Sequence, residues 1–139
     1  MNAHLPILVA DDDEDDIFFL RQAMRQAAIA NPLFVTSNGA EAIQYLSGEA
    51  PFADRSQYPE PGLFLLDLKM PMVGGFDVLD WMQGRPSFKK LPVVVLTSSP
   101  QETDRQKALQ LGASGYLVKP SHPGGLVTML RELQTQWLA

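Results

Sequence analysis

The sequence predicts an α/β fold: a doubly wound, five-stranded parallel sheet with helices on both faces. Several short apolar segments lack the alternation of half-exposed strands, which is typical of strands buried on both faces of a sheet. Segments with helical spacing lie between them, so that strand and helix alternate five times. This order favours right-handed crossovers and a three-layer sandwich. At 139 residues, 45% of them hydrophobic, the chain fits one domain spanning residues 1–139, with a core from about 5 to 138.

The predicted strands are short, mostly apolar segments. They are residues 5–10, 33–36, 62–66, 91–96 and 114–118, of which 33–36 is the weakest. The predicted helices are about 17–27, 39–46, 75–82, 102–111 and 126–137. The last helix is the clearest, because Leu126, Leu130, Leu133 and Trp137 recur at helical spacing. Prolines between residues 47 and 61 predict a long loop there, which we interpret as a tolerated insertion.

Composition and charge exclude several classes of function. The net charge of −5 disfavours attraction to nucleic acid or to anionic lipid. The chain has no cysteine, which excludes disulfides, thiolate catalysis and cysteine-ligated zinc. Residues 1–6 lack the features of a secretory signal, and no segment approaches the ~20 apolar residues of a membrane span. We therefore expect a cytoplasmic protein that binds neither nucleic acid nor membrane.

Polar residues follow four of the predicted strands. Ligands of open α/β sheets bind beyond the carboxyl ends of the strands, so these residues are the first candidates for a functional site. They are Asp11, Asp12 and Asp13 after the first strand, Asp67 after the third, Thr97 after the fourth, and Lys119 with Pro120 after the fifth. This combination of carboxylates, a hydroxyl and an ammonium indicates chemistry, because core packing does not require it. We interpret the neighbouring Glu14 to Asp16 as a solvated helix start.

Carboxylates that lie close together repel one another, which indicates a bound cation. At ~4 Å and an effective dielectric constant near 20, a like-charged pair costs about 4 kcal/mol. A hard divalent cation with oxygen ligands relieves this repulsion, and Mg²⁺ suits a site with few protein carboxylates. Asp67 would then be an aspartyl nucleophile for a phosphoryl group, Lys119 would bind a phosphoryl oxygen, and the Thr97 hydroxyl would couple phosphorylation to loop movement.

Four segments at these strand ends resemble the signatures of the response-regulator receiver domain of two-component signalling, the CheY-like superfamily. They are Ile7 to Asp16, Leu65 to Pro71, Val94 to Ser98 and Gly115 to Pro120. Together they extend the resemblance over about residues 7–138. The resemblance implies a flavodoxin-like (βα)5 sandwich with strand order 2-1-3-4-5. The long loop, the acidic Asp13 to Asp16 region and the late Trp137 are most similar to stand-alone regulators associated with phytochromes.

The resemblance also implies roles for individual residues. Asp67 is the implied phosphoacceptor and a metal ligand, Asp12 a direct metal ligand, Asp11 a ligand mainly through water, and the backbone carbonyl of Lys69 a further ligand. Thr97 and Tyr116 are the implied switch residues, and Lys119 the phosphoryl-binding cation. The Lys119–Pro120 peptide bond is expected to be cis at Pro120, which would orient the lysine.

The implied function is that of a signalling phosphoacceptor, which catalyses only its own phosphoryl transfer and dephosphorylation. The donor would be a sensor histidine kinase, with a bacteriophytochrome as one candidate. Without a separate output domain, the signal would pass to an unknown downstream protein or to a homodimer. The implied dimer face comprises the last two helices and the fifth strand, with Val127 and Met129 as candidate contacts.

Three alternatives belong to other functional classes. A haloacid-dehalogenase-like phosphatase would use Asp11 as nucleophile and Asp13 as acid, but Glu14 follows where that motif requires a small or hydroxyl residue. A calcium-binding loop starting at Asp11 lacks its glycine, because Asp16 stands there, and has Gln22 where a glutamate is needed. A receiver-like module that binds partners without phosphorylation stays open, although the complete set of site residues argues against it.

Overall fold

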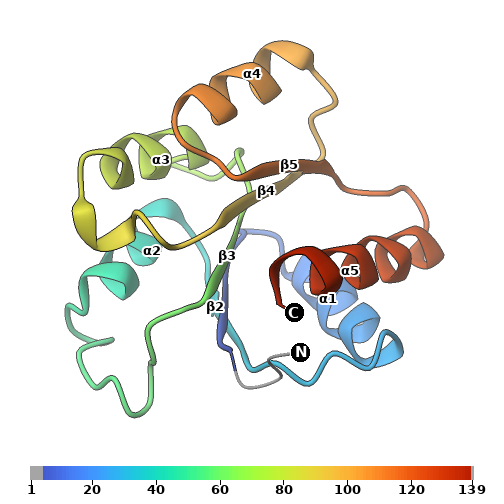
Figure 1. The fold of residues 1–139 in the computed structure, drawn as a ribbon, viewed down its shortest axis with the longest axis horizontal. Helices are drawn as coiled ribbons and strands as arrows, with labels where there is room; N and C mark the ends of the chain where they lie inside the picture. Colours follow the sequence, from blue (N-terminus) through green and yellow to red (C-terminus); the bar gives the residue numbers. More distant parts are fainter. Residues whose placement is uncertain (1–4, 139) are drawn as a thin grey trace.

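The computed structural model describes residues 5–138, apart from the side chain of Pro123, and contains a five-stranded parallel sheet between two helical layers (Figure 1). The strands are β1 (Ile7–Ala10), β2 (Leu33–Thr36), β3 (Leu63–Leu66), β4 (Val93–Thr97) and β5 (Gly115–Val118). The helices are α1 (Glu14–Gln26), α2 (Gly39–Ser47), α3 (Gly75–Gln83), α4 (Glu102–Gln110) and α5 (Pro123–Trp137). The strand order β2-β1-β3-β4-β5 confirms the predicted fold class.

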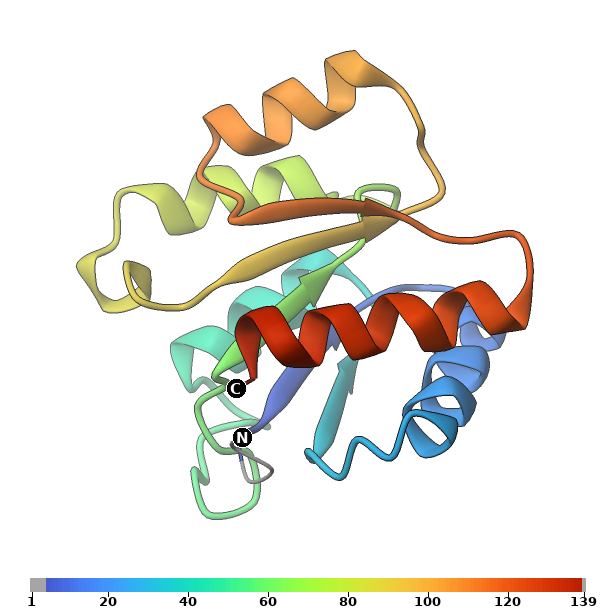
Figure 2. The ribbon, with the colours of Figure 1, turned by 45° about the vertical axis from the view of Figure 1, so that its right-hand side comes forward.

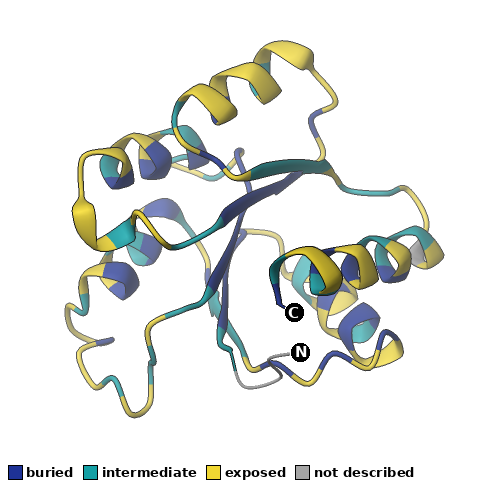
Figure 3. Cartoon of the chain, in the orientation of Figure 1, coloured by how far each residue is buried: buried dark blue, intermediate teal, exposed yellow. Residues whose placement is uncertain are grey.

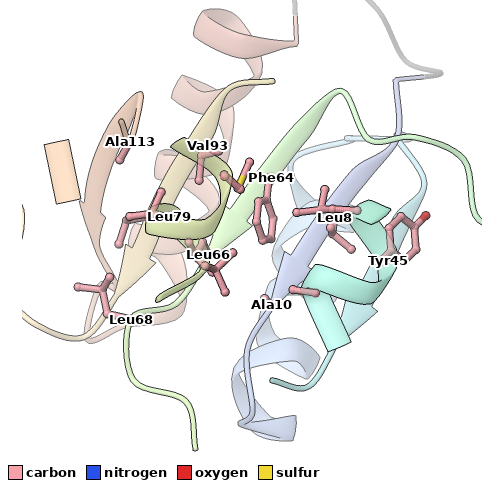
Figure 4. Close-up of a cluster of buried hydrophobic side chains, with 14 of the residues drawn as sticks. Leu8, Ala10, Tyr45, Phe64, Leu66, Leu68, Leu79, Val93 and Ala113 are labelled. Carbon is pink, nitrogen blue, oxygen red and sulfur yellow. The ribbon is translucent and has the colours of Figure 1, made fainter. Parts of the chain in front are cut away.

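Each face of the sheet carries its own hydrophobic core. One core cluster packs under α2, α3 and α4 and contains Leu8, Ala10, Phe64, Leu66 and Leu79 (Figure 4). The second core cluster packs under α1 and α5 and contains Ile7, Val9, Leu65 and Leu130. Successive residues of β1 and β3 thus alternate between the two clusters. Both sides of these strands are therefore buried, while the outer sides of the helices are exposed (Figure 3).

Helices α1 and α5 lie side by side on one face of the sheet (Figure 2). In α5, Leu130 and Leu133 are buried in the second core cluster, as their spacing predicts. Val127 is also buried there, with 9% of its surface exposed, so the prediction that it contributes to a dimer face is wrong. Its position on the same helical stripe as Leu130 directs it to the sheet. Met129 is half-buried.

Helices α2, α3 and α4 begin where predicted, whereas α1 and α5 begin three residues before their apolar stripes, because polar caps are hard to place by periodicity. Helix α1 begins at Glu14, since the Asp13 carboxylate accepts hydrogen bonds from the backbone N–H groups of Asp15 and Asp16. Helix α5 begins at Pro123, where the His122 imidazole accepts a hydrogen bond from Gly125 N–H. A short 3₁₀ helix at Pro86–Phe88 was not predicted. Among the described residues, no helix is long and apolar enough to cross a membrane.

The proline-rich segment between α2 and β3 is an irregular loop, as predicted, but it packs closely on α2. The Tyr45 ring contacts Phe52 and Tyr58, with ring centroids 5.1 and 6.1 Å away, and its hydroxyl donates a hydrogen bond to Pro59 O. The Arg55 guanidinium donates to the carbonyls of Leu46 and Tyr58. The loop therefore adds an aromatic extension to the first core cluster.

Candidate functional site

The candidate site lies where the carboxyl ends of the central strands meet. Backbone hydrogen bonds extend the sheet by one residue past the strand ends: Asp67 N–H donates to Ala10 O over 3.0 Å, and Lys119 N–H donates to Thr97 O over 2.7 Å. Since β1 lies next to β3, and β4 next to β5, this ladder brings side chains from distant parts of the sequence together. The backbone of the site residues is therefore held in place by the sheet.

Three carboxylates form an acidic cluster at this edge of the sheet. Asp11, Asp12 and Asp67 each offer an oxygen, and these oxygens lie within 4.8 Å of one another. Asp11 and Asp67 are 6% and 8% exposed, whereas Asp12 is exposed to solvent. Burial of two carboxylates is costly unless a positive charge compensates them. The oxygen donors and the open side at Asp12 fit a hard divalent cation, which keeps part of its hydration shell.

Lys119 supplies a positive charge at this site. Its ammonium Nζ lies 2.8 Å from Asp11 Oδ2, 2.6 Å from Asp16 Oδ2 and 3.4 Å from Asp67 Oδ2. Burial by itself would lower the pKa of Lys119, but the hydrogen bonds to Asp11 and Asp16 and the charge of Asp67 raise this pKa above its ordinary value. The lysine is therefore held as a cation by three carboxylates.

The two buried carboxylates are oriented by the backbone. Asp11 Oδ1 accepts a hydrogen bond from Asp13 N–H, and Asp67 Oδ1 accepts one from Leu68 N–H. In each case the second oxygen, Oδ2, faces Lys119. Desolvation raises the pKa of Asp11 even though the hydrogen bond from Lys119 acts in the opposite direction. Burial therefore disfavours the charged form of Asp11, and the nearby Lys119 ammonium stabilises it.

The start of α3 packs so closely against the backbone of Asp67 and Leu68 that a side chain would not fit at Gly75. Gly75, the first residue of α3, donates a hydrogen bond from its N–H to Leu68 O, and a Cβ atom at this position would clash with the Asp67 carbonyl. The Asp77 carboxylate accepts a hydrogen bond from Gly74 N–H and so ties the loop to the helix start. Lys69, whose carbonyl was expected to bind a metal, lies exposed in this loop.

Thr97 and Tyr116 are connected through Ser99, which sequence reasoning did not single out. Thr97 is fully buried, and its hydroxyl oxygen accepts a hydrogen bond from Ser99 N–H. The Tyr116 hydroxyl donates to Ser99 O over 2.8 Å, and the Ser99 hydroxyl donates to the Asp104 carboxylate over 2.6 Å. The loop between β4 and α4 is thus bonded to β5 and to the first turn of α4.

The predicted cis bond at Pro120 is wrong. Among the described residues the cis peptide bond lies at Ala50–Pro51, and Lys119–Pro120 is not cis. The direction of the lysine is determined by its ion pairs with Asp11 and Asp16 instead. Charge attraction over less than 3 Å suffices to place the flexible side chain, so the backbone need not adopt the rarer isomer.

Asp16 is the second residue that the sequence interpretation missed. It was assigned to a solvated helix start, yet its side chain reaches Lys119 from the first turn of α1 and makes the shortest of the three ion pairs. The sequence signal for this contact was the helix cap at Asp13, because a cap there places Asp16 in the first turn of α1, beside the strand end. A cavity of about 320 Å³ opens next to this pair, between Phe19 and Leu20 of α1 and Leu126 of α5.

Comparison with known proteins identifies the family of the chain. The family model of the response regulator receiver domain matches residues 7–131. The response regulator Rcp1 of Synechocystis sp. is 30% identical over 132 residues, which cover 95% of this chain and 88% of Rcp1. The crystal structure of the phosphorylated cyanobacterial phytochrome response regulator RcpA superposes with a TM-score of 0.88 at 29% identity, covering 98% of this chain and 95% of RcpA.

A second solved structure is the Mn²⁺-bound form of Rcp1, with a TM-score of 0.84 at 29% identity, covering 96% of this chain and 94% of that one. The family model spans most of the chain, and the observed fold superposes on solved response regulators. The protein therefore belongs to the response regulator receiver domain family, and within it is similar to phytochrome response regulators.

Proposed function

We propose that Asp67 accepts a phosphoryl group and that this modification switches the signalling state of the protein. The observation that carries the proposal is the position of the Asp67 carboxylate, in the acidic cluster with Asp11 and Asp12 and 3.4 Å from the Lys119 ammonium. Receiver domains are signalling proteins, and the similar RcpA has been solved in a phosphorylated form. Asp67 is the carboxylate in this cluster that directly follows the central strand β3.

In the transfer, an Asp67 oxygen attacks the phosphorus atom and forms a P–O bond while the bond from phosphorus to the donor breaks with its electron pair. Asp67 is suited to this role, because the hydrogen bond from Leu68 N–H to Oδ1 orients the carboxylate and Oδ2 faces Lys119. Lys119 would bind an oxygen of the transferred group and offset its negative charge. Water would then attack the phosphorus of the acyl phosphate on Asp67, and breaking the bond from phosphorus to Asp67 would release inorganic phosphate and restore the carboxylate.

We further propose that the acidic cluster binds Mg²⁺ through Asp11, Asp12, Asp67 and the carbonyl of Lys69. Support comes from the oxygens gathered within 4.8 Å and from the Mn²⁺-bound form of the similar Rcp1. The ion would neutralise charge on the phosphoryl group during transfer. Asp12, which is exposed, would bind it directly, and Asp11 would contribute mainly through water.

The phosphoryl donor that we propose is a phosphohistidine of a sensor histidine kinase, with a phytochrome as the candidate sensor, because Rcp1-like regulators are the similar proteins. Phosphorylation would move Thr97 toward the phosphoryl group and thereby alter its bond to Ser99 and the packing of Tyr116. The output would be a changed association with a downstream protein or with a second copy. Val118 on edge strand β5 and Leu109 on α4, 40% and 38% exposed, are candidate contacts.

The test is incubation with acetyl phosphate, with Mg²⁺ or with EDTA, followed by rapid quenching and intact-mass analysis. The wild type should gain one phosphoryl group when Mg²⁺ is present, and Asp67→Asn should gain none. Asp80→Asn, which alters an exposed aspartate on α3, is the matched control and should behave as the wild type.

Retained phosphorylation in folded Asp67→Asn would overturn the assignment of the phosphoacceptor. Absence of any adduct in the folded wild type with Mg²⁺ would instead favour a receiver-like module that binds its partners without phosphorylation.

A further inference from the structure

The ammonium of Lys119 contacts two of the three carboxylates of the acidic cluster. It contacts Asp11 Oδ2 and Asp67 Oδ2, the two oxygens that the backbone N–H groups of Asp13 and Leu68 leave available. A cation at the acidic cluster draws on the same carboxylates, since Asp11 and Asp67 are two of the three residues of this cluster. Two positive charges that share carboxylate oxygens repel each other. Lys119 therefore competes with a metal ion unless another group holds it aside.

Asp16 is the group that can hold Lys119 aside. Its Oδ2 lies 2.6 Å from Nζ, compared with 2.8 Å for Asp11 and 3.4 Å for Asp67. Asp16 reaches the ammonium from the first turn of α1, whereas Asp11 and Asp67 approach from strand ends. It does not belong to the set of three carboxylates that can surround one ion. Its attraction for Lys119 therefore persists when a metal engages the other carboxylates.

We propose that Asp16 is a positioning residue, which draws Lys119 toward α1 and so leaves Asp11 and Asp67 available to Mg²⁺. This inference rests on the metal site proposed above and adds Asp16 to the residues that determine how tightly the site binds Mg²⁺. With Mg²⁺ bound, the Lys119–Asp16 pair keeps the ammonium beside the site, poised to bind a phosphoryl oxygen. When Asp67 carries a phosphoryl group, the Lys119 ammonium contacts both that group and the Asp16 carboxylate.

The chain contains a matched control for the charge of Asp16. Asp15 precedes it in the same first turn of α1 and carries the same charge, but it is exposed and makes none of the ion pairs found among the described residues. Asp15→Asn and Asp16→Asn therefore remove equal charges from neighbouring positions. They differ in the contact with Lys119, which isolates the proposed role.

The test measures the Kd for Mg²⁺ by isothermal titration calorimetry on unphosphorylated protein. Asp16→Asn should raise the Kd about three- to fivefold, the range of a partly exposed ion pair, and Asp15→Asn less than about twofold. Lys119→Met should lower the Kd by removing the competing cation. In the Lys119→Met background, Asp16→Asn and Asp15→Asn should change the Kd equally, which forms a double-mutant cycle. Circular dichroism checks the fold of each variant.

A rise of the Kd in Asp16→Asn that persists without Lys119 would overturn the inference, because Asp16 would then attract Mg²⁺ by its own charge. Equal effects of Asp16→Asn and Asp15→Asn with Lys119 present would also overturn it, and this comparison stands even if Lys119→Met does not fold. A wild type that binds no Mg²⁺ would contradict the proposed metal site itself, so the two failures are distinguishable.

Discussion

The ammonium of Lys119 contacts three carboxylates, two of which are shielded from water. Asp11 and Asp67 are almost fully buried, and Asp16 is partly exposed, so the first two depend most on the lysine for compensation. Desolvation raises the pKa of Asp11 despite the bond to Lys119, which indicates that burial is the larger effect at this carboxylate. The stability of the metal-free protein therefore depends on a residue whose proposed role is in signalling.

Replacement of Lys119 by methionine should destabilise the protein in a manner that Mg²⁺ reverses. In EDTA, Lys119→Met should lower the free energy of unfolding by about 2 kcal/mol, because the buried carboxylates lose their charged partner. Saturating Mg²⁺ should restore most of this loss, since the ion binds the folded state and neutralises the same carboxylates. Urea unfolding in EDTA and in Mg²⁺ measures both values. Lys90→Met, at an exposed lysine, is the control and should change neither.

An equal loss of stability in EDTA and in Mg²⁺ would contradict this account. It would mean that the packing of the lysine side chain, and not its charge, stabilises the surrounding residues.

At the scale of elements, the loop between α2 and β3 is held by one tyrosine of α2. The Tyr45 ring is buried against Phe34, Phe52 and Tyr58, and its hydroxyl bonds to Pro59 O near the end of the loop. Burial raises the pKa of Tyr45 to about 12, and the nearby Arg55 offsets only part of this effect. The loop thus belongs to the hydrophobic core, which its proline content did not reveal.

The raised pKa makes the contribution of Tyr45 to stability dependent on pH. The folded state retains the phenol proton more strongly than the unfolded chain, whose tyrosines titrate near 10, so this contribution is complete below pH 10 and is lost as pH rises towards 12. At pH 7, Tyr45→Phe should cost about 1 kcal/mol, the value of one hydrogen bond. This cost should shrink above pH 10.

Near-ultraviolet absorbance during alkaline titration measures the ionisation directly. The step near pH 12 should be absent from Tyr45→Phe and present in Tyr116→Phe. Ionisation of Tyr45 near pH 10 in the folded protein would show that its hydroxyl is in contact with water.

The sequence predicted the elements better than the contacts between them. The central strands β1, β3 and β4 were recognisable because unalternated apolar runs reflect burial on both faces. The strand-end residues Asp11, Asp67 and Lys119 do lie together. Asp16 and Ser99 were missed, since periodicity does not tell which polar side chain of a helix or loop turns toward a strand end. The predicted cis bond at Pro120 came from the family resemblance and had no independent support in the residues of this chain.

At the scale of the whole molecule, the sheet joins two cores that share no helix. Leu65 and Leu66 are neighbours on β3 and both almost fully buried, but they belong to opposite core clusters. The chain also has two tryptophans, one for each side: Trp81 of α3 packs on the first core cluster and Trp137 of α5 on the second. Because every central strand contributes to both clusters, we expect the two faces to unfold as one cooperative unit.

Loss of packing on one face should therefore destabilise the other face equally. Leu65→Ala should lower the free energy of unfolding by about 2–5 kcal/mol, the usual cost of a cavity in place of a buried leucine. The effect is measured by urea unfolding in two single-tryptophan backgrounds, Trp137→Phe and Trp81→Phe, each compared with its own parent. Fluorescence of Trp81 reports the face opposite to the substitution, and fluorescence of Trp137 reports the same face.

Both tryptophans should report the same loss of stability, although Leu65 packs only in the cluster that contains Trp137. If the Trp81 transition kept its midpoint while the Trp137 transition shifted, the two layers would be separate folding units. That result would also contradict the expectation of one domain, since a domain requires its cores to be coupled through the sheet. Coupled transitions would mean that a change at the strand ends, where the candidate site lies, affects the stability of both helical layers.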